Sequence, residues 1–241
     1  EENKDLFQEI ALTSNSQNPI KLTDLYSLDD YFIDIEKLSR KTYAPLSKDS
    51  PIASVWFFER TAGQFKVFRQ QSIGRTSSRK KIRNFDQQYP SSKKANSFSQ
   101  VITKDQLGKS EMAWLQMPDR FAKGGVNCFD AYMRYLDGIK TSNESKKLNI
   151  DERYYKHLVS RIILLRTLED YIGINNEENG YKRGFHRQPV LGYSISILSK
   201  ITNKKLNFDE IWENQEIGKN ILDLFKKIVP KVRNYFIDNF E

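Results

Sequence analysis

The sequence predicts an α+β protein, with a small antiparallel sheet in its N-terminal part and a mainly α-helical C-terminal part. Two observations support this class. Segments rich in aromatic residues and valine, VWFFER and QFKVF, flank Thr61-Ala62-Gly63, which is typical of two extended arms around a turn and so of a β-hairpin near residues 54–69. In the second half, apolar residues recur at intervals of three and four, which is typical of amphipathic helices.

A helix is expected before the hairpin. Thr23 or Ser27 can cap its N-terminus, because the hydroxyl of either residue can accept a hydrogen bond from a free backbone N–H of the first turn. Tyr31 and Ile35 then follow at helical spacing, and the helix is expected to end near Arg40.

Two registers are possible for the hairpin. In a three-residue loop Gly63 takes the left-handed conformation, and Trp56, Phe58 and Arg60 share one face of the ribbon. A two-residue loop would instead pair Glu59 with Lys66. The first register is preferred, because it leaves the face opposite Trp56 almost entirely apolar and suited to a core.

After the hairpin, Val101-Ile102 could form a short strand, and the elements that follow it are expected to be helices. Thr103-Lys-Asp-Gln106 matches a capping box, so a helix should begin there, and Pro118 should end it. Further helical periodicity occupies the segments 126–136, 155–172, 189–201, 207–213 and 217–240. The polar segment 140–149 suggests a boundary, which divides the chain into an α+β core (1–139) and a helical subdomain packed on it (140–241).

Composition excludes several classes of protein. The single cysteine, Cys128, cannot form an intrachain disulfide, and with two histidines it falls short of any zinc pattern. No apolar run approaches the roughly 18 residues of a membrane span, so no membrane partner is expected. A reducing, cytoplasmic setting fits these features best.

Positive charge is concentrated in residues 66–94. This basic segment holds nine lysines and arginines and one acid, Asp86, a net charge of +8, which equals the net charge of the whole chain. Such an excess is typical of a phosphate-binding surface. A solvated loop is the alternative, because serine and glycine are interspersed among the cations.

The first functional hypothesis is a module that binds DNA or RNA. Cations of the basic segment would contact phosphates, and the ribbon face with Trp56 and Phe58, or N-terminal amides, would contact bases. The candidate binding residues are Arg60, Gln64, Arg75, Arg79, Lys80, Lys81, Arg83, Asn15, Gln17, Asn18, Lys104 and Lys123.

The second hypothesis is a metal-dependent nuclease, in which carboxylates converge on a cation beside a lysine. Glu59, Asp105 and Lys109 are its candidate catalytic residues. Glu59 would point inward from a strand, which is costly unless it has a partner, so a structural ion pair is the alternative. No cofactor is evident from the sequence, and a nuclease would require Mg²⁺. A third hypothesis is a non-catalytic scaffold that docks a partner subunit.

Seven ordered segments resemble the abortive infection phage resistance (AIPR) family. They are IALTSNSQNPIKLTDL, VWFFERTAGQFKVF, FDQQYP, ITKDQLGKSEMAW, PDRFAKGG, YYKHLVSRIILLRTLE and LNFDEIWENQE, and they cover almost the whole chain. The resemblance implies a prokaryotic, cytoplasmic protein of antiphage defence that acts with other defence-system proteins.

The chain departs from the family pattern in two places. The family's Thr-Lys-x-Asp-x-x-Lys is replaced here by a stretch from Thr103 to Lys109 in which the acid, Asp105, stands one position early. The family's upstream Asn-Gly-x-Gln-Thr stretch does not occur. The resemblance therefore implies that this chain is the later portion of a longer protein.

Overall fold

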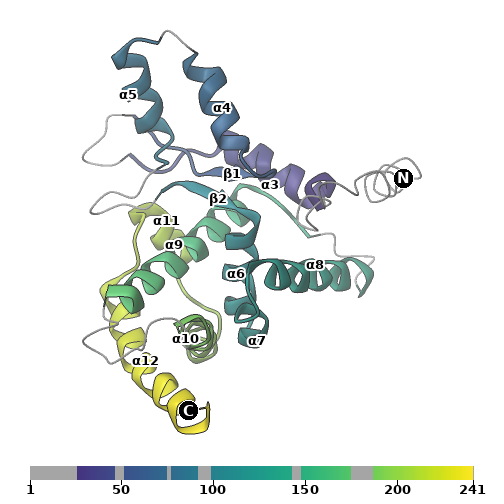
Figure 1. Cartoon of the computed structure of the whole chain (residues 1–241), viewed down its shortest axis with the longest axis vertical. Helices are drawn as coiled ribbons and strands as arrows, with labels where there is room; N and C mark the ends of the chain where they lie inside the picture. The colour runs from purple at the N-terminus through teal and green to yellow at the C-terminus, as the bar shows by residue number, and fades with distance from the viewer. Residues whose placement is uncertain are drawn as a thin grey trace.

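The computed structural model describes residues 26–46, 52–74, 77–91, 99–142, 148–174 and 187–240. These residues are mainly helical and form one two-stranded sheet, so the α+β class and the helical second half are confirmed (Figure 1). The elements in chain order are η1 (Tyr26–Leu28), α3 (Asp30–Lys41), β1 (Phe57–Glu59), α4 (Gln64–Ile73), α5 (Arg79–Gln88), β2 (Val101–Thr103), α6 (Lys104–Trp114), α7 (Pro118–Phe121), α8 (Gly125–Ser142), α9 (Glu152–Ile174), α10 (Arg187–Ile201), α11 (Phe208–Asn214) and α12 (Lys219–Phe240).

The predicted antiparallel hairpin near residues 54–69 is wrong. β1 pairs in parallel with β2, which places Phe57 opposite Val101 and Glu59 opposite Thr103. Val55, two residues before β1, makes an isolated antiparallel bridge to Tyr43 in the segment after α3. The sheet therefore joins two distant segments of the chain.

The second arm of the predicted hairpin is a helix. Gly63 takes the expected left-handed conformation, with a φ of 77°, but α4 begins directly after it. Phe65 and Phe68, three positions apart, both pack in one apolar cluster, whereas Val67 between them is 52% exposed. A three-residue spacing places side chains on one face of a helix and on opposite faces of a strand, so packing of Phe65 with Phe68 favours the helix.

The alternation expected within β1 is present. Trp56 and Phe58 belong to the main core, and Phe57 on the other face belongs to a second, smaller cluster. That cluster consists of Phe57, Phe65, Ile73 and Phe85, with Phe68, Ile82, Tyr89 and Val101 packed against it. The strand thus separates the two apolar cores of the described residues.

α4 and α5 form a helix pair that projects from the rest of the molecule. They lie side by side and run in opposite directions, with the C-terminal end of α4 and the N-terminal end of α5 farthest from the other helices (Figure 1). Among the described residues, the small cluster and the base of the pair join it to the body. The tip of the α4–α5 pair is therefore open to large partners.

The main core fills the space between α3, α6, α8, α9 and the C-terminal helices. Thr103 begins α6 with the predicted capping box, because its hydroxyl accepts from Gln106 N and the Gln106 side chain accepts from Thr103 N, both at 3.3 Å. α6 ends at Trp114, and Pro118 opens α7 rather than ending α6. Residues on both sides of position 140 contribute to this core, and the division into 1–139 and 140–241 stays a prediction.

The outer edge of β2 is covered by an arginine. The guanidinium of Arg166 in α9 donates to the carbonyl oxygens of Ser99 and Val101 and to the Gln106 side chain. Burial lowers the pKa of Arg166 to about 10. Because an open strand edge invites pairing with other chains, these contacts protect a sheet that has only two short strands.

Across the described part of the chain, none of the helices combines the length and the hydropathy needed to cross a lipid bilayer.

Candidate nucleic-acid interface

Part of the basic segment, for which a solvated loop was the alternative to a phosphate-binding surface, is the helix α5. Ser78 caps it, since its hydroxyl accepts a hydrogen bond from Lys81 N at 3.3 Å. Four cations lie within its first five residues, and all four are exposed: Arg79, Lys80, Lys81 and Arg83. The free N–H groups of the first turn add positive potential at the same end. The open tip of the α4–α5 pair is therefore strongly positive.

α5 is held in a fixed orientation. Phe85 is 8% exposed and packs in the small cluster, and Asp86 forms an ion pair with Arg69 of α4 at 3.2 Å. At the far end, Val55 N donates to Gln88 O at 2.8 Å. These contacts turn the apolar side of α5 toward α4 and leave its cationic side facing solvent.

A shallow hollow of about 480 Å³ lies along this solvent side. Arg79, Ile82, Arg83, Asp86 and Gln87 line it. Two of these side chains are cations and one is an amide, groups that can contact a phosphate or the polar edge of a base, and the one acid, Asp86, is paired with Arg69.

Sequence reasoning missed Asn84 and Gln87, which lie on α5 one turn beyond the cations. Asn84 is exposed and Gln87 is half-buried at the hollow. The signal for them was the spacing of Ile82, Phe85 and Tyr89, which is helical and extends the ordered segment past Arg83.

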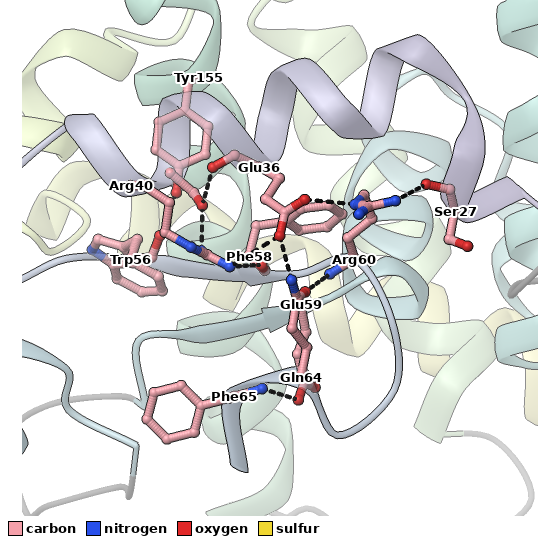
Figure 2. Close-up of polar contacts among 11 residues, drawn as sticks. Ser27, Glu36, Arg40, Trp56, Phe58, Glu59, Arg60, Gln64, Phe65 and Tyr155 are labelled. Atoms are coloured by element: carbon pink, nitrogen blue, oxygen red, sulfur yellow. Dashed lines mark hydrogen bonds and ion pairs between the residues drawn. The ribbon is translucent and has the colours of Figure 1, made fainter. Parts of the chain in front are cut away.

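Arg60 and Gln64 lie at the base of the α4–α5 pair, in a network centred on Glu36 of α3 (Figure 2). Glu36 accepts from Arg60 Nε at 2.5 Å, from Arg40 Nη2 at 3.4 Å and from Gln64 Nε2. Arg60 also donates to the carbonyl oxygen of Ser27. Both predicted binding residues therefore have intramolecular partners that fix where α4 leaves the body.

The aromatic face proposed for bases is not on the surface. Trp56 is 2% exposed and Phe58 is 0% exposed, because both pack in the main core. Trp56 Nε1 donates to Gln215 Oε1 at 2.7 Å, and Tyr155 donates to the Trp56 carbonyl oxygen. The expectation that these rings would stack on bases is wrong, since the strand that carries them is internal.

Glu59 acts as a cap for α4. Its carboxylate accepts a hydrogen bond from Phe65 N at 3.0 Å, at the N-terminus of the helix (Figure 2). A carboxylate is favoured there by the helix dipole. This contact explains why an acid is tolerated on the inner side of β1. Within the described part of the chain, the partner of Glu59 is a backbone N–H and not the basic side chain considered in the sequence analysis.

Asp105 and Lys109 lie elsewhere, on α6. The Asp105 carboxylate lies against Gly125 at the start of α8, and a Cβ added at that glycine would be 3.1 Å from it. Lys109 Nζ donates to Gln188 Oε1 at 3.1 Å. A catalytic role for Glu59, Asp105 and Lys109 stays a prediction.

The remaining candidates are scattered. Lys104 is 5% exposed, with its ammonium 5.9 Å from the centre of the Phe129 ring, and Lys123 is exposed between α7 and α8. Four candidates fall outside the described residues: Asn15, Gln17, Asn18 and Arg75.

No metal-binding group of three His, Cys, Asp or Glu side chains occurs among the described residues. Cys128 is buried in the main core, and burial raises the pKa of its thiol to about 12. At that pKa the thiol stays protonated at neutral pH, so Cys128 fills space in the core.

One comparison with known proteins gave a match. The family model described as "AIPR protein" matches residues 1–239. Searches of curated proteins and of solved structures found no significant match.

Proposed function

The chain belongs to the AIPR family, the abortive infection phage resistance proteins, and from this premise we propose that it supplies a nucleic-acid-binding surface for antiphage defence. The observation that supports the proposal is the concentration of exposed cations on α5. Four cations and one acid stand within its ten residues, and that acid, Asp86, is already paired with Arg69.

The geometry of the α4–α5 pair suits contact with a polyanion. Arg79 and Arg83 are four positions apart, so they lie on one side of the helix with Cβ atoms about 6 Å apart, and Lys80 lies beside them. Each cation that neutralises a phosphate releases a condensed counterion, which favours binding at low salt. The rigid small cluster behind α5 keeps these cations on one face, so little order has to be created on binding.

The test is a binding measurement with three forms of the protein. Fluorescently labelled DNA and RNA are titrated with the wild type, with Arg79→Ala/Lys80→Ala/Lys81→Ala/Arg83→Ala, and with a charge-matched control. The control removes four exposed lysines from the C-terminal helices and the loop between them: Lys200, Lys205, Lys227 and Lys231.

If α5 makes the contact, the α5 variant loses affinity by about 100-fold or more at 50 mM salt, since each phosphate contact contributes on the order of a kcal/mol, and the control stays within about threefold of the wild type. No binding of the wild type at low salt, or equal losses in both variants, would refute the proposal. Unchanged circular dichroism spectra of both variants verify that they fold.

A further inference from the structure

Resting on the proposed function, we propose a specific mode for it: α5 enters the major groove of duplex DNA, where its cations hold phosphates and Asn84 and Gln87 contact base edges.

The burial of the aromatic rings favours a duplex over a single strand. Proteins that bind single strands stack successive bases on exposed rings. Between the α4–α5 pair and β1 the rings instead pack on one another: Phe57 of β1 is 1% exposed, and Phe65 and Phe85 are each 8% exposed. Phe68 and Tyr89 complete the same cluster, with ring centres 5.1 Å apart. The solvent side of α5 offers cations and amides, which contact phosphates and groove edges without stacking.

The dimensions of α5 favour DNA over RNA. Ten helical residues span about 15 Å, and a helix with its side chains is about 10–12 Å across. The major groove of B-form DNA is about 12 Å wide and admits a helix, whereas that of A-form RNA is too narrow and deep. The α4–α5 pair also projects from the rest of the molecule (Figure 1). This projection is needed for the proposed mode, because a helix that lies flush with the protein surface could not enter a groove.

The order of side chains along α5 matches this placement. One stripe reads Arg79, Arg83 and Gln87 at intervals of four, and the adjacent stripe reads Lys80 and Asn84. Both stripes therefore pass from cation to amide. Arginine and lysine contact phosphates or guanine, and asparagine and glutamine can bond adenine through two hydrogen bonds.

The first arm of the test compares three probes of one sequence at about 100 mM salt: a 20-base-pair DNA duplex, its single strand and the corresponding RNA duplex. The DNA duplex should bind at least about tenfold more tightly than either alternative. Equal or tighter binding of the single strand or the RNA would overturn the groove mode and leave the proposed function standing. Failure of all three probes to bind would overturn the proposed function itself.

The second arm selects preferred sequences from a random DNA duplex library. The wild type should enrich sites containing adenine, with a discrimination of about 5- to 150-fold at each contacted position. Asn84→Ala/Gln87→Ala should lose this preference but keep its salt dependence and its affinity for unselected DNA. A control variant removes two exposed amides of α4, Gln70→Ala/Gln71→Ala, and should keep the preference.

An absence of any selected sequence, or a preference that survives Asn84→Ala/Gln87→Ala, would overturn the assignment. An unchanged urea midpoint verifies that the variant folds, and Asn84→Asp provides a second test, because a carboxylate there should weaken binding to all DNA by repelling phosphates.

Discussion

Replacement of Gly192 by alanine should destabilise the protein through a single contact. Gly192 is buried in α10, where a Cβ would lie 2.6 Å from Cδ1 and 2.9 Å from Cγ of Phe121. Phe121 is 1% exposed, so its ring cannot move aside without repacking α7. Overpacking of this kind costs about 1–3 kcal/mol. Against it stands a gain of about 1 kcal/mol, because alanine favours a helix more than glycine does.

Gly138→Ala is the matched control. Gly138 lies on the exposed side of α8, and a Cβ there would have no neighbouring atom within 4 Å. Only the helix-propensity gain remains, so this variant should be more stable than the wild type by up to about 1 kcal/mol. The propensity gain cancels when the two variants are compared, which isolates the packing cost.

Urea unfolding followed by circular dichroism measures both free energies of unfolding. We expect Gly192→Ala to be less stable than Gly138→Ala by about 1–3 kcal/mol, the packing cost itself. Equal stabilisation of the two variants would refute the close contact between Gly192 of α10 and Phe121 of α7.

Three further outcomes are expected. Glu111→Gln should lower the free energy of unfolding by about 3–5 kcal/mol, because it leaves the buried guanidinium of Arg161 without the carboxylate that it contacts at 2.6 Å. A loss below about 1 kcal/mol in a urea titration would contradict this. Glu36→Gln should speed amide hydrogen exchange in α4 about tenfold and leave exchange in α10 unchanged, because it weakens the hydrogen bonds of Glu36 at the base of the α4–α5 pair. Equal effects on both helices would argue against a local role of Glu36. The hydrogen bond from His157 holds the pKa of Asp209 below its usual range, so the stability that this carboxylate adds is present above pH 3.8 and is lost as the pH falls through the lower, folded value. Stabilities of the wild type and of Asp209→Asn should therefore converge in acid, and a gap that persists there would contradict the sign.

Local signals in the sequence were sufficient for the helices of the second half and for the start of α6, but not for α4 and α5 or for the cap of α3, which is Asp29 rather than Thr23 or Ser27. The capping box at Thr103 needs only residues three apart, and the left-handed turn at Gly63 follows from the lack of a side chain. The alternation of Trp56, Phe57 and Phe58 between two faces is likewise a property of any strand. These features were therefore predictable from neighbouring residues.

The errors came from contacts between distant segments. In a three-residue strand, the alternation of side chains between the two faces does not show whether the partner strand is antiparallel or parallel. The partner β2 also lies more than 40 positions after β1 along the chain. The stretch after Gly63 fits both periods, and only the packing of Phe65 and Phe68 against Phe85 decides for a helix.

The positive charge of the candidate site was predictable from the sequence, but the contacts of its residues within the protein were not. The cations of the basic segment are visible in the sequence, whereas the partners that occupy Arg60 and Gln64 come from Glu36, on a helix more than 20 residues earlier. A single sequence does not show that pairing, because the chain has 31 aspartates and glutamates and nothing in their order selects Glu36 as the partner.

Lysine acylation with and without DNA tests the central claim most directly. Lys80 and Lys81 are exposed on α5, and Lys227 and Lys231 are exposed on α12, so mass spectrometry can compare the two pairs in one sample. If α5 is the contact, saturating duplex DNA protects Lys80 and Lys81 and leaves Lys227 and Lys231 as reactive as before. Protection of the α12 pair alone, or of all four lysines equally, would contradict it.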